Sequence, residues 1–239
     1  MSTHKRADAT IHKIGHLLIV AGPTAAGKST VLDNLATADP LVLRERLGVE
    51  DLPSWSRIGA NRLVTSKQVQ ESRVILHYDF LWAPENSRAT GSLGNRVPAL
   101  TRGAREISLV TLWTPAVRLE RQLVEGKLRK ALASGWPERL KAALFRLLPR
   151  RLIRRLAAIL PLESLNRLLP GHQLIHHLLL VRIYSRRERV IQLYRRWLEL
   201  CDAEGSRIRN HCILEFDREL RFYSRAEWEA QALKEDDIK

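Results

Sequence analysis

Residues 22–30 place two glycines, a lysine and two hydroxyl side chains at a spacing suited to phosphate. The segment reads GPTAAGKST and fits the pattern G-x-x-x-x-G-K-[ST]. It consists of Gly22, Pro23, Thr24, Ala25, Ala26, Gly27, Lys28, Ser29 and Thr30. The glycines let the backbone turn so that successive N–H groups point at an anion, and Lys28 adds an ammonium group. The hydroxyl of Ser29 is suited to ligating Mg²⁺, with Thr30 as a supporting hydrogen-bonding group.

The segments on either side of this loop predict the elements that position it. Residues 16–21 (HLLIVA) form a short apolar run rich in branched side chains, which is typical of a buried parallel strand. Val31, Leu32 and Leu35 follow at helical spacing. The N-terminus of a helix attracts anions because its first N–H groups have no acceptor within the helix. Strand, loop and helix together predict a phosphate-binding site.

The string GPTAAGKST resembles the Walker A loop of P-loop NTPases and is most similar to that of the nucleoside and nucleotide kinase branch. The resemblance is specific over residues 16–35. It implies ATP or a related nucleotide as ligand, with Mg²⁺, and phosphate binding by Gly22, Gly27, Lys28, Ser29 and Thr30. With the apolar runs that follow, it leads us to expect a three-layer α/β fold of the P-loop NTPase type, with a mainly parallel sheet.

A site of this kind needs a second carboxylate to hold Mg²⁺, usually at the end of a neighbouring apolar strand. Residues 74–79 (VILHYD) end in Asp79, although His77 and Tyr78 interrupt the apolar run. Residues 212–217 (CILEFD) offer Glu215 and Asp217, but they also fit a terminal edge strand before a helix. We therefore expect Asp79 to ligate Mg²⁺ together with Ser29, and keep the later pair as the alternative.

Several motifs of other P-loop protein classes are absent from the sequence, which reduces the number of reactions that fit it. Phe80 follows Asp79 where P-loop ATPases that drive machines commonly place a Glu, and neither an NKxD nor an LSGGQ motif is present. The favoured function is kinase-like transfer of a phosphoryl group to a small acceptor, with Asp79 or His77 orienting or deprotonating the acceptor hydroxyl. His77 also fits a hydrogen-bonded core histidine. The alternative function is a nucleotide-gated peripheral membrane or scaffold protein with little catalysis.

Two further segments suggest contacts with the substrate. Residues 107–113 (ISLVTLW) predict a strand, and Thr114-Pro115 predicts the start of a helix running to about residue 134. Kinases of the resembled branch place arginines near here, so Arg121 is expected to be catalytic; an exposed helix arginine is the alternative. The polar residues 83–105 fit an acceptor-binding flap or a plain surface loop, with arginines at Arg88, Arg96, Arg102 and Arg105.

Positive charge is concentrated in one part of the chain. The whole chain has a net charge of +14, and most of it comes from residues 118–199, which contain 19 Lys and Arg but only 6 Asp and Glu. Leucines recur at helical spacing among these cations, which predicts a basic helical insertion at about 134–182. It fits a lid, a packed helical subdomain or a contact with anionic lipid. Nucleic acid is a weaker expectation, because Phe145 is the only Phe, Tyr or Trp between residues 139 and 182.

Length and composition bound the remaining possibilities. The 239 residues, 45% of them apolar and 28% charged, fit a single globular domain over 1–239. Two cysteines build no disulfide framework, and the apolar run at 17–21 is too short for a signal peptide, so a cytoplasmic location is expected, with peripheral membrane association as an option. The closeness of His172, His176 and His177 suggests a metal site, but His172 and His176, four residues apart, lack a third ligand, so no metal is expected there.

Overall fold

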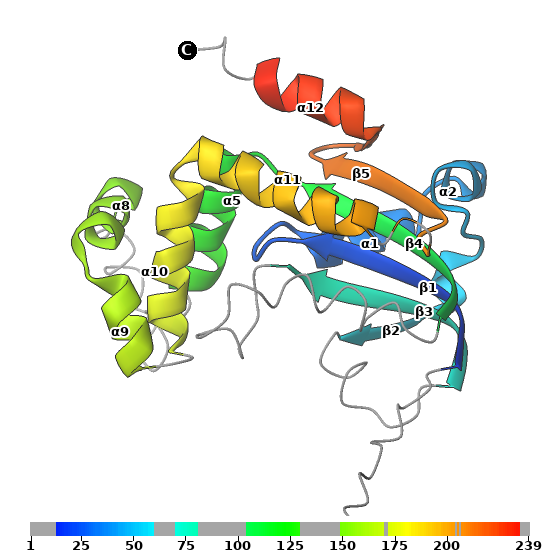
Figure 1. The fold of residues 1–239 in the computed structure, drawn as a ribbon, viewed down its shortest axis with the longest axis horizontal. Helices are drawn as coiled ribbons and strands as arrows, with labels where there is room; N and C mark the ends of the chain where they lie inside the picture. The colour runs from blue at the N-terminus through cyan, green and yellow to red at the C-terminus, as the bar shows by residue number, and fades with distance from the viewer. Residues whose placement is uncertain are drawn as a thin grey trace, which may run out of the picture.

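A computed structural model describes residues 13–59, 70–80, 104–129, 149–169, 172–203, 205 and 207–234. These residues form an α/β fold around a six-stranded sheet of order β2-β3-β1-β4-β5-β6 (Figure 1). The strands are β1 (Lys13–Gly22), β2 (Ser56–Gly59), β3 (Gln70–Asp79), β4 (Ala104–Trp113), β5 (Asn210–Phe216) and β6 (Leu220–Tyr223). Every neighbouring pair is parallel except β5 and β6. The expected α/β class with a mainly parallel sheet is therefore confirmed.

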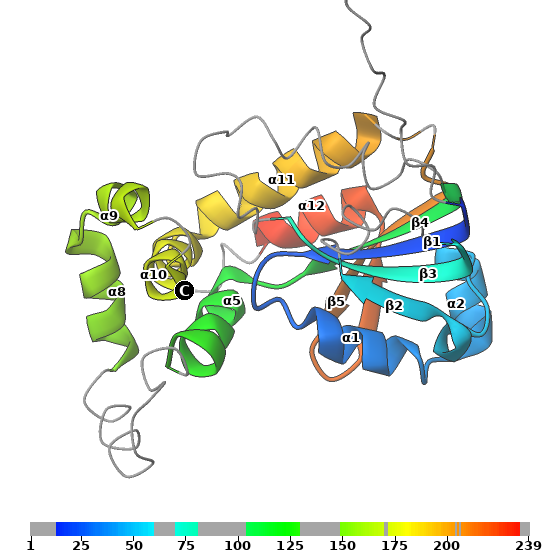
Figure 2. The same cartoon turned by 90° about the horizontal axis from the view of Figure 1, so that it is seen from below.

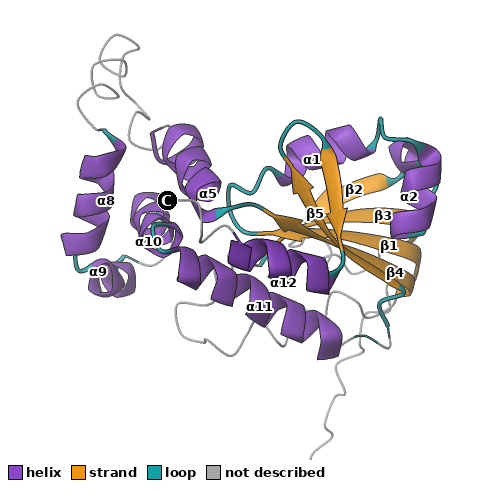
Figure 3. Ribbon diagram, turned by 90° about the horizontal axis from the view of Figure 1, so that it is seen from above, coloured by secondary structure: helices purple, strands orange, loops and turns teal. Residues whose placement is uncertain are grey.

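Helices cover both faces of the sheet, so the fold has three layers. Helices α1 (Lys28–Leu35) and α2 (Pro40–Leu47) lie on one face, and α11 (Arg187–Ala203) and α12 (Arg225–Lys234) lie on the other (Figure 2 and Figure 3). Burial on both faces explains why the central β1 contains the uninterrupted buried run from residue 17 to residue 21.

Polar side chains on β4 hold the two helical layers to the sheet. The Ser108 hydroxyl donates to the Leu47 carbonyl at the end of α2, at 2.7 Å. On the other face, the Trp197 indole of α11 donates to the Thr111 hydroxyl at 2.9 Å. Side chains alternate across a strand, so residues three apart point to opposite faces. The two hydrogen bonds therefore fix the helices on either side of one strand.

Local side-chain and backbone chemistry fixes two helix starts and one helix end. The Asp39 side chain accepts from the Leu41 N–H at 2.8 Å and caps α2, and Gly48 ends this helix with φ of 64°. At α12, the Ser224 N–H donates to the Glu227 carboxylate at 2.7 Å, and the Glu227 N–H donates back to the Ser224 hydroxyl at 3.3 Å. This reciprocal pair is a capping box.

The structure differs from the expected elements in three places. Strand β6 pairs with β5, so the segment expected to be a terminal edge strand is internal to the sheet. The helix after β4 is regular only in α5 (Ala116–Gln122) and continues as a π-helical segment, Leu123–Leu128. Arg105, expected in a polar loop, lies exposed within β4. Each difference depends on pairing or packing with distant residues rather than on local pattern.

The described part of the predicted basic insertion, which we call the basic block, forms a helical end beside the sheet. It contains α8 (Arg150–Ile159), α9 (Leu162–Leu168) and α10 (Gln173–Tyr184), and α10 packs against α8, α9 and α5 (Figure 1 and Figure 3). The leucines expected at 140–148 and the arginines at 88, 96 and 102 lie outside the described residues. Among the helices that the structure describes, none has the length and apolar content needed to cross a membrane.

Candidate functional site

The loop of residues 22–30 lies at the carboxyl edge of the central strand. Strand β1 ends at Gly22, and α1 begins at Lys28. From β1 the chain passes to β2 and β3 on one side and then to β4 on the other, so β1 stands where the strand order reverses. Open α/β sheets bind ligands at this position. Asp79 ends β3 directly beside Gly22 in the register of the sheet.

The two glycines of the loop are required for different physical reasons. A Cβ atom on Gly22 would lie 3.3 Å from the Cβ atoms of both Leu112 and Ala26, so a side chain there would crowd the loop against β4. Gly27 has φ of 83°, which other residues rarely adopt, and nothing lies within 4 Å of its missing Cβ. Gly27 occupies the cap position of α1, so no side chain of its own covers the first N–H groups of that helix.

The buried Lys28 side chain folds back onto its own loop. Its ammonium donates to the carbonyls of Gly22 and Pro23, at 2.8 and 2.7 Å. The same ammonium lies 3.5 Å from Asp79 Oδ2, which accepts a hydrogen bond from the buried Thr24 hydroxyl at 2.6 Å. Lysine, carboxylate and hydroxyl therefore form one connected group at the junction of β1 and β3.

Side chains from distant elements orient the remaining loop carbonyls. The Tyr184 hydroxyl at the end of α10 donates to the Thr24 carbonyl at 2.8 Å. The Thr114 hydroxyl, just after β4, donates to the Ala26 carbonyl at 3.2 Å. In a trans peptide unit the N–H points opposite to the carbonyl. The N–H groups that follow Thr24 and Ala26 therefore point away from these partners, which is the arrangement an anion cradle needs.

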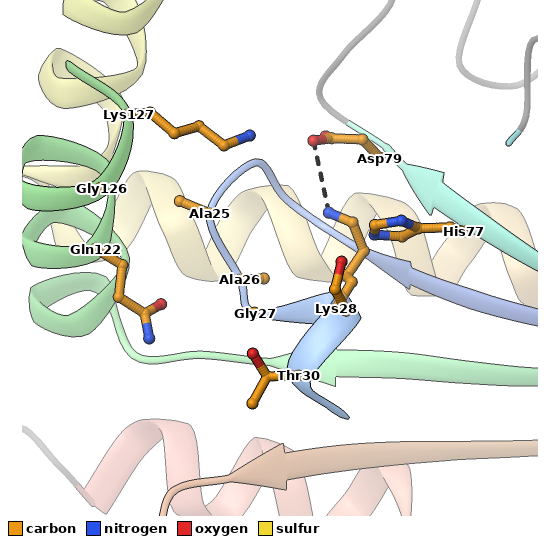
Figure 4. A pocket seen from close by; sticks show the side chains of 11 residues that line it. Ala25, Ala26, Gly27, Lys28, Thr30, His77, Asp79, Gln122, Gly126 and Lys127 are labelled. Atoms are coloured by element: carbon orange, nitrogen blue, oxygen red, sulfur yellow. Dashed lines mark ion pairs between the residues drawn. The ribbon is translucent and has the colours of Figure 1, made fainter. Parts of the chain in front are cut away.

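A cavity of about 650 Å³ opens above this group and the N-terminus of α1 (Figure 4). This volume falls in the range of roughly 300 to 1,000 Å³ that is usual for small-molecule sites. Its described lining comprises Ala25, Ala26, Gly27, Lys28, Ser29, Thr30, His77, Asp79, Gln122, Gly126 and Lys127. Most of the predicted loop residues and Asp79 thus line one cavity. Gly22, Pro23 and Thr24 lie outside the lining and hydrogen-bond to Lys28 or Asp79.

The electrostatics of the cavity favour an anionic ligand. Burial lowers the pKa of Lys28 to about 8, against the raising effect of Asp79, and Lys127 lowers it further. A buried ammonium in contact with one carboxylate gains from a second negative partner. His77 is exposed and lines the cavity, so the core-histidine alternative is wrong. Burial and the nearby Lys28 lower the pKa of His77, which favours a neutral imidazole near pH 7.

The π-helical segment after α5 supplies a cation that the sequence did not single out. Lys127 extends across the cavity toward Asp79, with Gln122 and Gly126 beside it (Figure 4). Open space surrounds the position of a Cβ on Gly126. Insertions of π-helix are frequent at functional sites. Arg121 lies one residue before Gln122, but it is exposed and outside the lining of the cavity; its catalytic role stays a prediction.

The alternative carboxylates, Glu215 on β5 and Asp217 just after it, have other partners. Glu215 accepts from the Tyr223 hydroxyl at 3.2 Å, and Asp217 forms an ion pair with Arg118 at 2.9 Å. Strand β4 separates β5 from β1, so the end of β5 lies about 10 Å from the loop strand, twice the spacing to β3. Asp79 is therefore the carboxylate that the sheet brings to Lys28.

The histidines of the basic block lie on or beside α10. Burial lowers the pKa of His176 to about 4, and the adjacent His177 and Lys127 lower it further. His172 is exposed and directly precedes α10. Across the part of the chain that the structure describes, no group of three or more His, Cys, Asp or Glu side chains is placed to hold a metal ion.

Comparison of the chain with models of known protein families, with curated proteins and with solved structures gives no match. The functional reading therefore depends on the geometry of the loop and its cavity.

The hydrogen bond from Tyr184 to the loop gives a first testable prediction. Tyr184→Phe leaves the Thr24 carbonyl without this donor and should lower the free energy of unfolding by about 1–2 kcal/mol. It should also weaken the nucleotide binding that the sequence predicts, by several-fold, because the adjacent N–H loses its orientation. Tyr223→Phe is the control, since its hydroxyl donates to the Glu215 carboxylate on β5, away from the loop. Equal nucleotide affinities in the two variants, measured by calorimetric titration, would contradict the prediction.

Proposed function

We propose that the chain is a P-loop NTPase of the kinase-like type, which binds ATP with Mg²⁺ at residues 22–30 and transfers the γ-phosphoryl group to a small acceptor hydroxyl. The observation that carries this proposal is the ammonium of Lys28 held 3.5 Å from Asp79 at the edge of a cavity above a helix N-terminus. The sequence motif and the strand, loop and helix around it support the same reading.

The binding of the triphosphate follows from the groups that line the cavity. The loop amides and the N-terminus of α1 would cradle the β- and γ-phosphates, and Lys28 would contact both. Magnesium ions keep several waters and take one or two carboxylates together with substrate phosphates, so a cage of several protein ligands is not required. Ser29 and Asp79 line the same cavity and fit this role. When bound, Mg²⁺ would neutralise charge on the phosphate oxygens.

The transfer itself needs positioning and one proton acceptor. The acceptor oxygen forms a bond to the γ-phosphorus while the bond from that phosphorus to the β,γ-bridging oxygen breaks, and ADP leaves. The proton of the acceptor hydroxyl passes to Asp79 or to the neutral imidazole of His77. Lys127, on the opposite wall, would balance the negative charge of the transferred group. These roles use only side chains that line the described cavity.

The direct experiment is to incubate the protein with ATP, Mg²⁺ and a panel of small hydroxyl compounds, and to follow ADP release and phosphorylated product. Turnover that depends on one acceptor class supports the proposal. Absence of ATP binding in a calorimetric titration would contradict the proposal, because every later step requires bound ATP.

A second candidate function is favoured by the contact between Tyr184 and Thr24. This contact joins the loop to α10, against which α8 and α9 pack. A change in the loop on nucleotide binding would reach the basic helices through α10, as a nucleotide-gated scaffold with little catalysis requires. Tight ATP binding without turnover across the whole acceptor panel would favour this candidate over the kinase.

Substitutions of Lys127 and Arg121 test which cation contributes to the cavity wall opposite Asp79. Lys127→Ala should lower kcat/KM for ATP by about tenfold or more, because it removes a charge-assisted contact to phosphate. Arg121→Ala removes the same charge from the same helical region but outside the cavity lining, and we expect a smaller effect. Steady-state kinetics of both variants, with Lys127→Arg as a charge-retaining control, decide the point. A larger loss in Arg121→Ala would return the catalytic role to Arg121.

A further inference from the structure

Helix α8 has two apolar stripes, and only one of them is packed. Ile153 and Ala157 are buried, at 2% and 1% exposure, and the Arg182 guanidinium of α10 donates to the Ala157 carbonyl at 2.7 Å. Leu152, Leu156 and Ile159 follow helical spacing on a neighbouring face and are 38%, 40% and 80% exposed. We call these three side chains the α8 stripe. A stripe of this kind on a helix at the outer end of a molecule indicates an interaction surface.

The arginines of α8 divide into two sets. Arg154 forms an ion pair with the buried Glu120 of α5, and Arg150 lies 4.0 Å from Glu125. These pairs hold the inner side of α8 to α5 and the π-helical segment. Arg151 and Arg155 are exposed and border the α8 stripe at helical spacing, and the described residues supply no acidic partner for them.

The charge around the α8 stripe has one sign. Residues 149–169 contain five arginines and one acidic residue, Glu163. The Glu163 carboxylate is itself paired with Arg182 at 2.7 Å. Helix α9 adds two exposed leucines near its end, Leu168 and Leu169, with Arg167 beside them. The α8 and α9 end therefore presents leucines among uncompensated cations.

We propose that this end, centred on the α8 stripe, docks on an anionic lipid surface. An amphipathic helix with leucines on one face and arginines at its border lies in the plane of a membrane interface, where the apolar side chains enter the acyl boundary and the cations meet headgroups. A second copy of the chain is disfavoured, because each copy has a net charge of +14 and brings the same arginines to the contact. Single-stranded nucleic acid is disfavoured because residues 149–169 contain no aromatic side chain for base stacking.

The proposal goes beyond the phosphate site, because none of its residues lines the cavity. The test is flotation with phosphatidylcholine vesicles that do or do not contain phosphatidylserine. The parent should float with the anionic vesicles and much less with the neutral ones. Leu152→Ser combined with Leu156→Ser should lower partitioning at least about tenfold, since each leucine loses its apolar burial. Arg151→Gln combined with Arg155→Gln should lower partitioning onto the anionic vesicles about fivefold for each charge removed, and should make this partitioning less dependent on salt.

Matched controls use exposed residues elsewhere on the surface. Leu41→Ser combined with Val117→Ser removes two side chains that are 65% and 72% exposed outside this end, and Arg207→Gln combined with Arg218→Gln removes two exposed cations. These controls should float like the parent, and circular dichroism should show every variant folded. A parent that stays in the soluble fraction, or a leucine variant that floats as well as the parent, would overturn the proposal. So would light scattering that shows a dimer lost in the leucine variant.

Discussion

Lys28→Ala is expected to lower the affinity for ATP at least about 100-fold while the protein remains folded. The side chain supplies charge-assisted contacts to two phosphates, each worth about 1.5–3 kcal/mol, and together these correspond to a factor of 100 or more. The rest of the anion cradle is backbone and survives the substitution. Titration of a fluorescent ATP analogue into both proteins measures the effect.

The stability of the Lys28→Ala variant depends on two opposing effects. The Gly22 and Pro23 carbonyls each lose a donor, at 2.8 and 2.7 Å, which destabilises the fold, whereas removal of a buried ammonium whose pKa is lowered to about 8 relieves a cost of burial. We therefore expect the free energy of unfolding to stay within about 2 kcal/mol of the parent value. Lys28→Met is the matched control, because it keeps the apolar stem and removes only the charge. Equal ATP affinities in Lys28→Met and the parent would contradict the central proposal.

The strand, loop and helix around residues 22–35 could be predicted from sequence because their signals are local. The apolar run before Gly22, the turn residues and the helical spacing after Lys28 all fall within about two dozen residues, and each specifies a backbone conformation by its own chemistry. The helix caps at Asp39 and Ser224 were predictable for the same reason, since a cap satisfies N–H groups only a few residues away.

The walls of the cavity could not be predicted in this way. Tyr184 reaches the Thr24 carbonyl across 160 positions of sequence, and Lys127 lines the cavity because a π-helical segment turns it toward β3. Neither side chain belongs to a pattern that distinguishes it from other tyrosines or lysines. Their placement follows from the packing of α10 against α5 and the π-helical segment.

The sequence only partly indicates which carboxylate lies beside Lys28. The sequence offered Asp79 and the pair Glu215 and Asp217 at the ends of apolar runs, which are similar as local patterns. Strand order distinguishes them, because β3 is the direct neighbour of β1 and β5 is separated from it by β4. Strand order depends on how crossover connections pack, and no local pattern in either segment encodes it.

Asp79→Asn is expected to lower the rate of phosphoryl transfer about 100-fold or more while ATP binding persists. The amide keeps the size of the carboxylate and can still accept from the Thr24 hydroxyl, now 2.6 Å from Asp79 Oδ2, so the loop should hold its shape. It loses the charge proposed to hold Mg²⁺ and to accept a proton, and removal of one such electrostatic group commonly costs a factor of this size. Single-turnover kinetics with saturating ATP separate this loss from any change in binding.

The conditions and the control for Asp79→Asn follow from its neighbours. Asp79 raises the pKa of Lys28, so the variant should lose some of the Lys28 charge as pH rises, and ATP binding is best compared at about pH 6.5, below the pKa of about 8 that Lys28 has in the parent. Glu215→Gln is the matched control, because it removes a carboxylate from β5, where Glu215 accepts from the Tyr223 hydroxyl. We expect it to keep the parent rate of transfer. Full transfer in Asp79→Asn together with loss of transfer in Glu215→Gln would move the Mg²⁺ role to the end of β5.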